Sequence, residues 1–122
     1  MGAKLTSLGS LRNTGVVQIG MDVNSLVEYP ELPLNLAIID FSYNLFTTRP
    51  PFIPTAINSL RINNCQLTVE AVSEILTIID SYGTQNGFID LQNQTPAAIP
   101  NAAGLTAKAN LEGRGWSVYV DA

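Results

Sequence analysis

Histidine is absent from this chain of 122 residues, and cysteine occurs once, at Cys65. Without histidine, an acid–base site would have to be built from carboxylates, tyrosine or lysine. Without a second cysteine the chain cannot form an internal disulfide. Cys65 has no lysine or arginine cluster near it in the sequence that could stabilise a thiolate. We therefore expect a protein that is not an enzyme, with no catalytic residue and a structural role for this cysteine.

Charge is also scarce. Charged residues make up 13% of the chain, with six basic and ten acidic side chains and a formal net charge of −4. Typical soluble domains carry about 25%. With no lysine or arginine cluster, binding of nucleic acid by counterion release is not expected. No apolar run approaches the roughly 18 residues that a membrane span requires. A complete calcium loop and a glycine-rich phosphate cradle are missing too, so we expect no metal and no cofactor.

A leucine-rich-repeat pattern, L-x-x-L-x-L-x-x-N-x-L, occurs twice in the middle of the chain. Its defined positions are filled by Leu36, Ile39, Phe41, Asn44 and Phe46, and again by Ile57, Leu60, Ile62, Cys65 and Leu67. The step from Ile39 to Leu60 is 60 − 39 = 21 residues, and the steps from Leu60 to Ile89 and from Ile89 to Val118 are 29 residues each. This spacing predicts parallel strands that lie side by side.

Helices are predicted in the later repeats alone. Val69, Val72, Ile75, Leu76 and Ile79 recur at helical spacing after the capping residue Thr68, and Gly83 ends this helix. A second helix is expected to begin at Asn101 and to run through Leu105, Ala109 and Leu111. Three prolines within residues 50–54 exclude a helix after the first repeat strand.

The expected fold class is therefore α/β: a short leucine-rich-repeat-like solenoid with about four parallel strands backed by two helices. A small open α/β sheet without repeat symmetry is the alternative. We divide the chain into an N-terminal arm or cap, residues 1–33, and a repeat domain, residues 34–122. The arm has leucines at every third position, at Leu5, Leu8 and Leu11, and a short predicted strand over residues 16–19.

The outward face of the predicted strands is the usual binding surface of a repeat protein. Alternation along the strands places on it Asp40, Ser42, Arg61, Asn63, Asp90, Gln92, Ser117 and Tyr119. In-register stacking would set Arg61 between Asp40 and Asp90. This ladder is either a charged recognition stripe or ordinary cross-strand pairing worth about 0.2–1 kcal/mol per pair, and we favour the second interpretation.

The C-terminal half follows a recognisable scheme. A helix is followed by Asn86-Gly87, a strand, a loop of small residues and proline, a second helix, and then Gly115-Trp116-Ser117-Val118. Over about residues 57–121 this resembles the leucine-rich-repeat-like module of virion structural proteins of tailed bacteriophages. That family implies no catalytic residues, and it includes both capsid-decorating and adhesive members.

The resemblance implies a non-enzymatic capsid decoration (cement) protein, which binds the major capsid protein or another virion protein on the outside of a phage head. The protein would be found in the virion and, during assembly, in the host cytoplasm. Self-association into a homo-oligomer stays open. The candidate capsid contacts are Leu5, Leu8, Leu11, Val16, Val17, Ile19 and Phe52. The alternative is a receptor- or glycan-binding module of a phage fibre or baseplate, which should expose aromatic side chains such as Tyr119 on the strand face. A cellular peptide-binding repeat protein is a third hypothesis.

Overall fold

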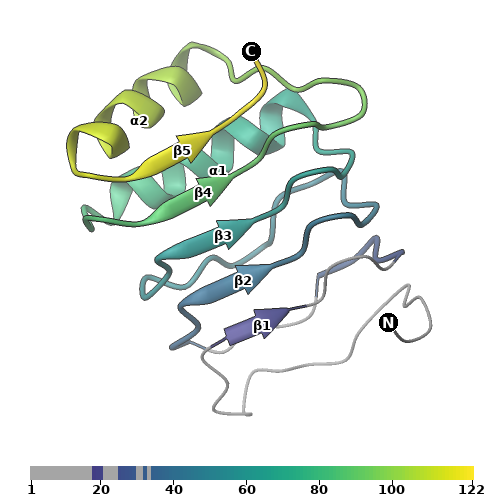
Figure 1. The fold of residues 1–122 in the computed structure, drawn as a ribbon, viewed down its shortest axis with the longest axis horizontal. Helices are drawn as coiled ribbons and strands as arrows, with labels where there is room; N and C mark the ends of the chain where they lie inside the picture. Colours follow the sequence, from purple (N-terminus) through teal and green to yellow (C-terminus); the bar gives the residue numbers. More distant parts are fainter. Residues whose placement is uncertain (1–17, 21–24, 30–31, 33) are drawn as a thin grey trace.

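A computed structural model describes residues 18–20, 25–29, 32 and 34–122 of the chain. Five strands form one parallel sheet in chain order (Figure 1). They are β1 (Gln18–Gly20), β2 (Ile38–Asp40), β3 (Ser59–Arg61), β4 (Phe88–Asp90) and β5 (Ser117–Tyr119). Helix α1 (Val69–Ser81) joins β3 to β4, and α2 (Ala102–Gly113) joins β4 to β5. The α/β class, the parallel sheet and the two helices agree with the sequence prediction. The sheet has one strand more than the predicted four, because β1, inside the proposed arm, pairs with β2.

The central residues of the predicted strands lie side by side. Ile39 of β2 pairs with Leu60 of β3, Leu60 with Ile89 of β4, and Ile89 with Val118 of β5. All four side chains are buried in one apolar core. Each strand is three residues long, so Ser42, Asn63 and Gln92, which the alternation placed on the strand face, lie beyond the ends of β2, β3 and β4. Alternation therefore identified the centre of each strand correctly and overestimated its length.

The same backbone turn follows three consecutive strands. Four residues after the buried centre of β2, β3 and β4 stand Tyr43, Asn64 and Asn93, with φ of 57°, 55° and 60°. Asparagine adopts this left-handed conformation more readily than other residues with a side chain. Tyr43 is a bulky residue there, and its side chain is exposed. The turn reverses the chain at the same distance from each strand and so keeps successive units in register.

The next residue in each turn is a buried polar group that satisfies the backbone. Asn44 accepts a hydrogen bond from the Leu26 N–H (3.1 Å) and donates one to the Phe41 carbonyl (2.9 Å). Cys65, in the equivalent position, accepts from the Asn44 N–H at 3.4 Å and donates to the Phe41 carbonyl at 3.5 Å. These contacts give Cys65 the structural role that the sequence predicts, and Asn44 plays the same part in the turn before it.

Gln94 occupies this position after β4, which sequence reasoning did not anticipate. Its side-chain oxygen accepts from the Leu67 N–H at 2.9 Å. Its amide nitrogen donates to the carbonyls of Ile62 (2.7 Å) and Leu91 (3.1 Å). The leucine-rich-repeat pattern expects asparagine or cysteine at this position, so a glutamine there does not match it. Its spacing of five residues from Ile89, the same as from Ile39 to Asn44, is the signal that could have found it.

Both helices lie at the β4–β5 end of the sheet (Figure 1). Thr68 caps α1, its hydroxyl accepting from the Ala71 N–H at 3.1 Å, and Asn101 caps α2 by accepting from the Gly104 N–H at 2.9 Å. Both caps were predicted. The buried face of α2 consists of Gly104, Ala107 and Leu111, so Leu111 alone of the three apolar residues that mark the predicted helix is buried. A Cβ on Gly104 would lie 3.0 Å from Ser73 of α1, so the two helices approach each other closely there, and Leu105 is exposed.

The connection from β2 to β3 contains no helix, as its prolines predict. Pro50, Ile53 and Pro54 are buried, and Phe52 is half-buried against the core. Packing within the chain therefore explains much of the apolar character of this segment. Because Phe52 is half-buried, less of its side chain is available for a capsid contact than the sequence suggests.

Candidate binding surface on the strand face

The outward row of the sheet has the register that the sequence predicts. Asp40 pairs with Arg61, Arg61 with Asp90, and Asp90 with Tyr119, each on the next strand. Adjacent strands in a sheet are about 4.8 Å apart. Four of the predicted surface residues are thus brought together in a single line across β2 to β5.

The predicted charge ladder does not form. Asp40 accepts hydrogen bonds from the N–H and the hydroxyl of Ser42, at 3.1 and 2.5 Å. Asp90 accepts in the same way from the Gln92 N–H at 3.1 Å. Within the part of the chain that the structure describes, Arg61 forms no salt bridge. The two carboxylates bond to the backbone two residues on, as aspartate often does where a strand gives way to a turn.

Arg61 stacks instead on an aromatic ring. Its guanidinium carbon lies 4.4 Å from the centre of the Phe88 ring, and Phe88 lies 5.6 Å from Tyr119 with the two rings tilted by 49°. Such a cation–π contact is worth about 0.5–1 kcal/mol at an exposed site. Arg61 is exposed and Tyr119 is 46% exposed. We name this set of three residues from neighbouring strands the Arg61–Phe88–Tyr119 cluster.

The other predicted surface residues differ in accessibility. Ser117 is exposed, whereas Asn63 and Gln92 are half-buried. Ser42 is only 5% exposed, so its expected place on an open surface is wrong: the side chain is turned into the hydrogen bond with Asp40. Among the candidate capsid contacts, Leu5, Leu8, Leu11, Val16 and Val17 lie outside the described residues. Ile19 lies in β1 and pairs with Ile39.

Sequence reasoning missed two apolar residues of this face. Phe88 is the outward neighbour of Ile89, and Ile38 is the outward neighbour of Ile39. Each stands directly before a core isoleucine, so the pair of apolar residues does not by itself show which of the two points outward. Strict alternation would have placed them outward with Asp90 and Asp40, since residues two apart share a face of the sheet.

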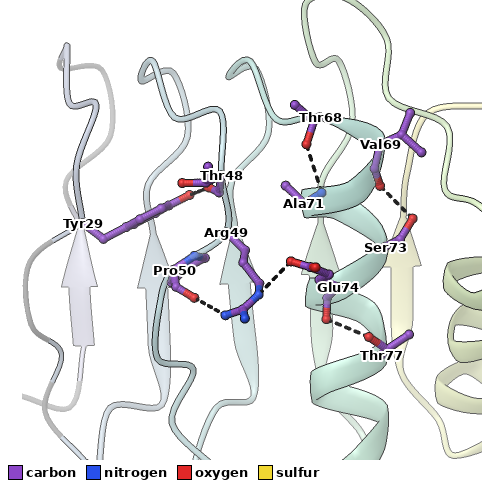
Figure 2. A network of polar contacts seen from close by, with 10 residues as sticks. All are labelled: Tyr29, Thr48, Arg49, Pro50, Thr68, Val69, Ala71, Ser73, Glu74 and Thr77. Carbon is purple, nitrogen blue, oxygen red and sulfur yellow. Dashed lines mark hydrogen bonds and ion pairs between the residues drawn. The ribbon is translucent and has the colours of Figure 1, made fainter.

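Two surface depressions lie away from the strand face, each with a volume of about 220 Å³. This is below the roughly 300–1,000 Å³ of typical small-molecule sites. One lies between residues 48–49 and the first turns of α1, and Figure 2 shows the contacts around it. Arg49 donates to Glu74 at 3.0 Å and to the Pro50 carbonyl at 2.9 Å. These bonds attach the helix-free connection to α1, a structural role.

Tyr29 contributes to the same region. Its hydroxyl donates to the Thr48 carbonyl at 2.6 Å, and its ring stacks on Phe46 with 3.9 Å between centroids. Burial, with a smaller contribution from Cys65, raises the pKa of Tyr29 well above its usual value. Burial also raises the pKa of the Cys65 thiol, against the opposing effect of backbone N–H bonds. A thiol with a raised pKa is a weak nucleophile at neutral pH.

Among the described residues, no group of three or more histidine, cysteine, aspartate or glutamate side chains lies close enough together to hold a metal ion. No helix in those ranges has the length and apolar character needed to span a membrane. No protein-family model matches the chain, and no curated protein matches it significantly. The function of the protein is therefore inferred from the geometry of the molecule and from the resemblance of residues 57–121 to a phage virion module.

Proposed function

We propose that the chain is a short leucine-rich-repeat-like solenoid. The observation that carries this proposal is the recurrence of one unit: a parallel strand, a left-handed residue, and a buried polar residue that bonds to the backbone. Tyr43–Asn44, Asn64–Cys65 and Asn93–Gln94 repeat it in register after β2, β3 and β4. Repeat proteins of this kind work by presenting a surface to a partner.

We propose further that the protein is a capsid decoration protein that binds the major capsid protein, or another virion protein, on the outside of a phage head. The resemblance of residues 57–121 to a phage virion module supports this function. The scarcity of charge supports it too, since charged residues are depleted in the cores of protein interfaces. The leucines at every third position of residues 5–11 provide an apolar segment that a capsid surface could bury.

The test is attachment to particles of the phage whose genome encodes this chain. The purified protein should bind particles that lack it, with a fixed stoichiometry on a gel, and should raise their resistance to heat. Absence of binding, or binding without any gain in heat resistance, would contradict the cement function. A genome that encodes no capsid genes would contradict the viral assignment altogether.

A truncated chain that begins at Gln18 tests the contribution of the first 17 residues. The truncation keeps β1 and the buried Leu26, both of which belong to the folded sheet and core. Losing even two leucine contacts of about 1.5 kcal/mol each should weaken particle binding roughly a hundredfold. Thermal unfolding of the truncated chain, followed by circular dichroism, is the control for folding. Unchanged particle binding would place the contact on the repeat body.

A second candidate function, receptor or glycan binding, is favoured by the Arg61–Phe88–Tyr119 cluster. It combines an exposed aromatic ring with a guanidinium that has five donors, and Asp90 lies in the same row. Sites for polar small molecules combine apolar surface with a few placed hydrogen-bonding groups in this way. The carboxylates of Asp40 and Asp90 on either side of Arg61 disfavour an anionic ligand, so a neutral sugar fits this face better.

Binding to host cells tests this candidate. Tyr119→Ala should reduce adsorption of the labelled protein to host cells at least about tenfold, the effect of losing roughly 1.4 kcal/mol. Leu105→Ala removes an equally exposed side chain on α2 and should leave adsorption unchanged. Equal adsorption of both variants would exclude the strand face as the receptor site. If the wild-type protein does not adsorb to host cells but binds phage particles normally, the decoration function is favoured.

A further inference from the structure

The turn between α1 and β4 contains Asn86-Gly87, the one Asn-Gly sequence in the chain. Asn86 is exposed and has a left-handed backbone, with φ of 63°. Its N–H donates to the Arg114 carbonyl at 3.2 Å, which fixes the turn against the end of α2. Gly87 is the last residue before β4. The pair therefore sits at the entrance to a strand of the sheet.

Packing accounts for both residue types. A Cβ atom on Gly87 would lie 2.2–2.4 Å from three carbons of the Trp116 ring, so residue 87 has to be glycine. The left-handed conformation at position 86 favours asparagine or glycine. Asn86 also packs over Gly115, since its Oδ1 lies 2.3 Å from the place where a Cβ of residue 115 would be. Two separate structural demands thus create the Asn-Gly sequence.

The backbone N–H of Gly87 makes no hydrogen bond to any of the described residues. Most interior strand and turn amides are held in such bonds. Because glycine has no side chain, nothing on residue 87 obstructs the approach of its nitrogen to the Asn86 side chain, and Asn86 is open to water.

We propose that Asn86 is a site of spontaneous deamidation. The Gly87 nitrogen, once deprotonated, attacks the Asn86 Cγ: an N–Cγ bond forms, the Cγ–Nδ2 bond breaks, and ammonia leaves. The product is a five-membered succinimide. Water then opens the ring at one of its two carbonyls and yields aspartate or isoaspartate. No oxidant or enzyme is required, and the rate rises with pH because the attacking amide must lose its proton.

The modification changes the fold locally. Isoaspartate inserts one methylene group into the main chain directly before β4, and either product changes the net charge from −4 to −5. The extra atom displaces Gly87 relative to Trp116, a ring that is buried and hydrogen-bonded to the Thr84 carbonyl at 2.9 Å. The aged protein should therefore unfold at a lower temperature than the fresh protein.

The test is incubation of the full chain at neutral and mildly alkaline pH, followed by peptide mass mapping. The expected result is conversion of Asn86, faster at the higher pH, with one added negative charge on ion exchange and isoaspartate detected as a methyl acceptor. Asn93 is the internal control: it is also exposed and left-handed, but Gln94 follows it. Equal conversion of Asn86 and Asn93 would overturn the proposal.

A variant separates this chemistry from other ageing. Asn86→Gly keeps a residue that accepts positive φ and removes the reactive Cγ, so it should fold, gain no charge and keep its unfolding temperature during incubation. If the wild-type Asn86 stays intact while the same peptide converts after cleavage from the chain, the fold protects the site and the proposal is wrong. It is equally wrong if neither converts.

Discussion

Gly87→Ala should be among the most destabilising single substitutions in this protein. The added methyl group would lie 2.2 Å from a ring carbon of Trp116. That ring cannot move away cheaply, because it is buried and its Nε1 donates to the Thr84 carbonyl. Overpacking of a filled core costs about 1–3 kcal/mol and occasionally more. For an overlap of this depth we expect at least about 3 kcal/mol, a large share of the roughly 5–15 kcal/mol that stabilises a typical domain.

Denaturant unfolding of the variant checks this value, and Gly113→Ala is the matched control. Gly113 is the last residue of α2, and a Cβ there would meet nothing within 4 Å. The same chemical change should therefore be neutral or stabilising by up to about 1 kcal/mol. Adding Gly87→Ala to a Trp116→Leu chain should cost much less than adding it to the wild type. A wild-type midpoint for Gly87→Ala would mean that Trp116 does not cover Gly87.

The sequence predicted the sheet well because its signal is periodic. Ile39, Leu60, Ile89 and Val118 recur at repeat spacing, and a one-residue slip would move each of them to the solvent face. The fifth strand was harder to place. β1 contributes three residues, Gln18–Gly20, and no complete repeat template accompanies it. Its position follows from hydrogen bonding to β2, a tertiary contact that composition does not encode.

The register of the candidate surface was predicted correctly, but the ion pairs expected on it were wrong. Register placed Arg61 between Asp40 and Asp90, and opposite charges on neighbouring strands suggested ion pairs. Two local effects compete with that pairing. Each aspartate has a backbone N–H two residues away that it can reach without ordering a second long side chain, and an exposed ion pair is worth little. Arg61 has a ring beside it in Phe88. Pairwise charge reasoning omits both alternatives.

Gln94→Met is the second substitution for which we expect a large effect. Methionine has nearly the same length and shape, so the variant removes the amide and leaves the volume filled. The Leu67 N–H then loses its acceptor, and the carbonyls of Ile62 and Leu91 lose a donor, all in a place where Gln94 is 4% exposed. A buried polar group without a partner costs about 1–3 kcal/mol. With three groups affected, we expect a loss of about 3–5 kcal/mol in unfolding free energy.

Gln92→Met makes the same chemical change two residues away and isolates the effect of the hydrogen bonds. Gln92 is half-buried on the strand face, and its backbone N–H, which the substitution keeps, makes the bond to Asp90. We expect a change within about 0.5 kcal/mol, as for other substitutions near the surface. If the two variants unfold at the same denaturant concentration, the hydrogen bonds of Gln94 do not stabilise the contact between neighbouring units. The buried polar residue after β4 then has no energetic role, and the repeat assignment loses the feature that its three units share.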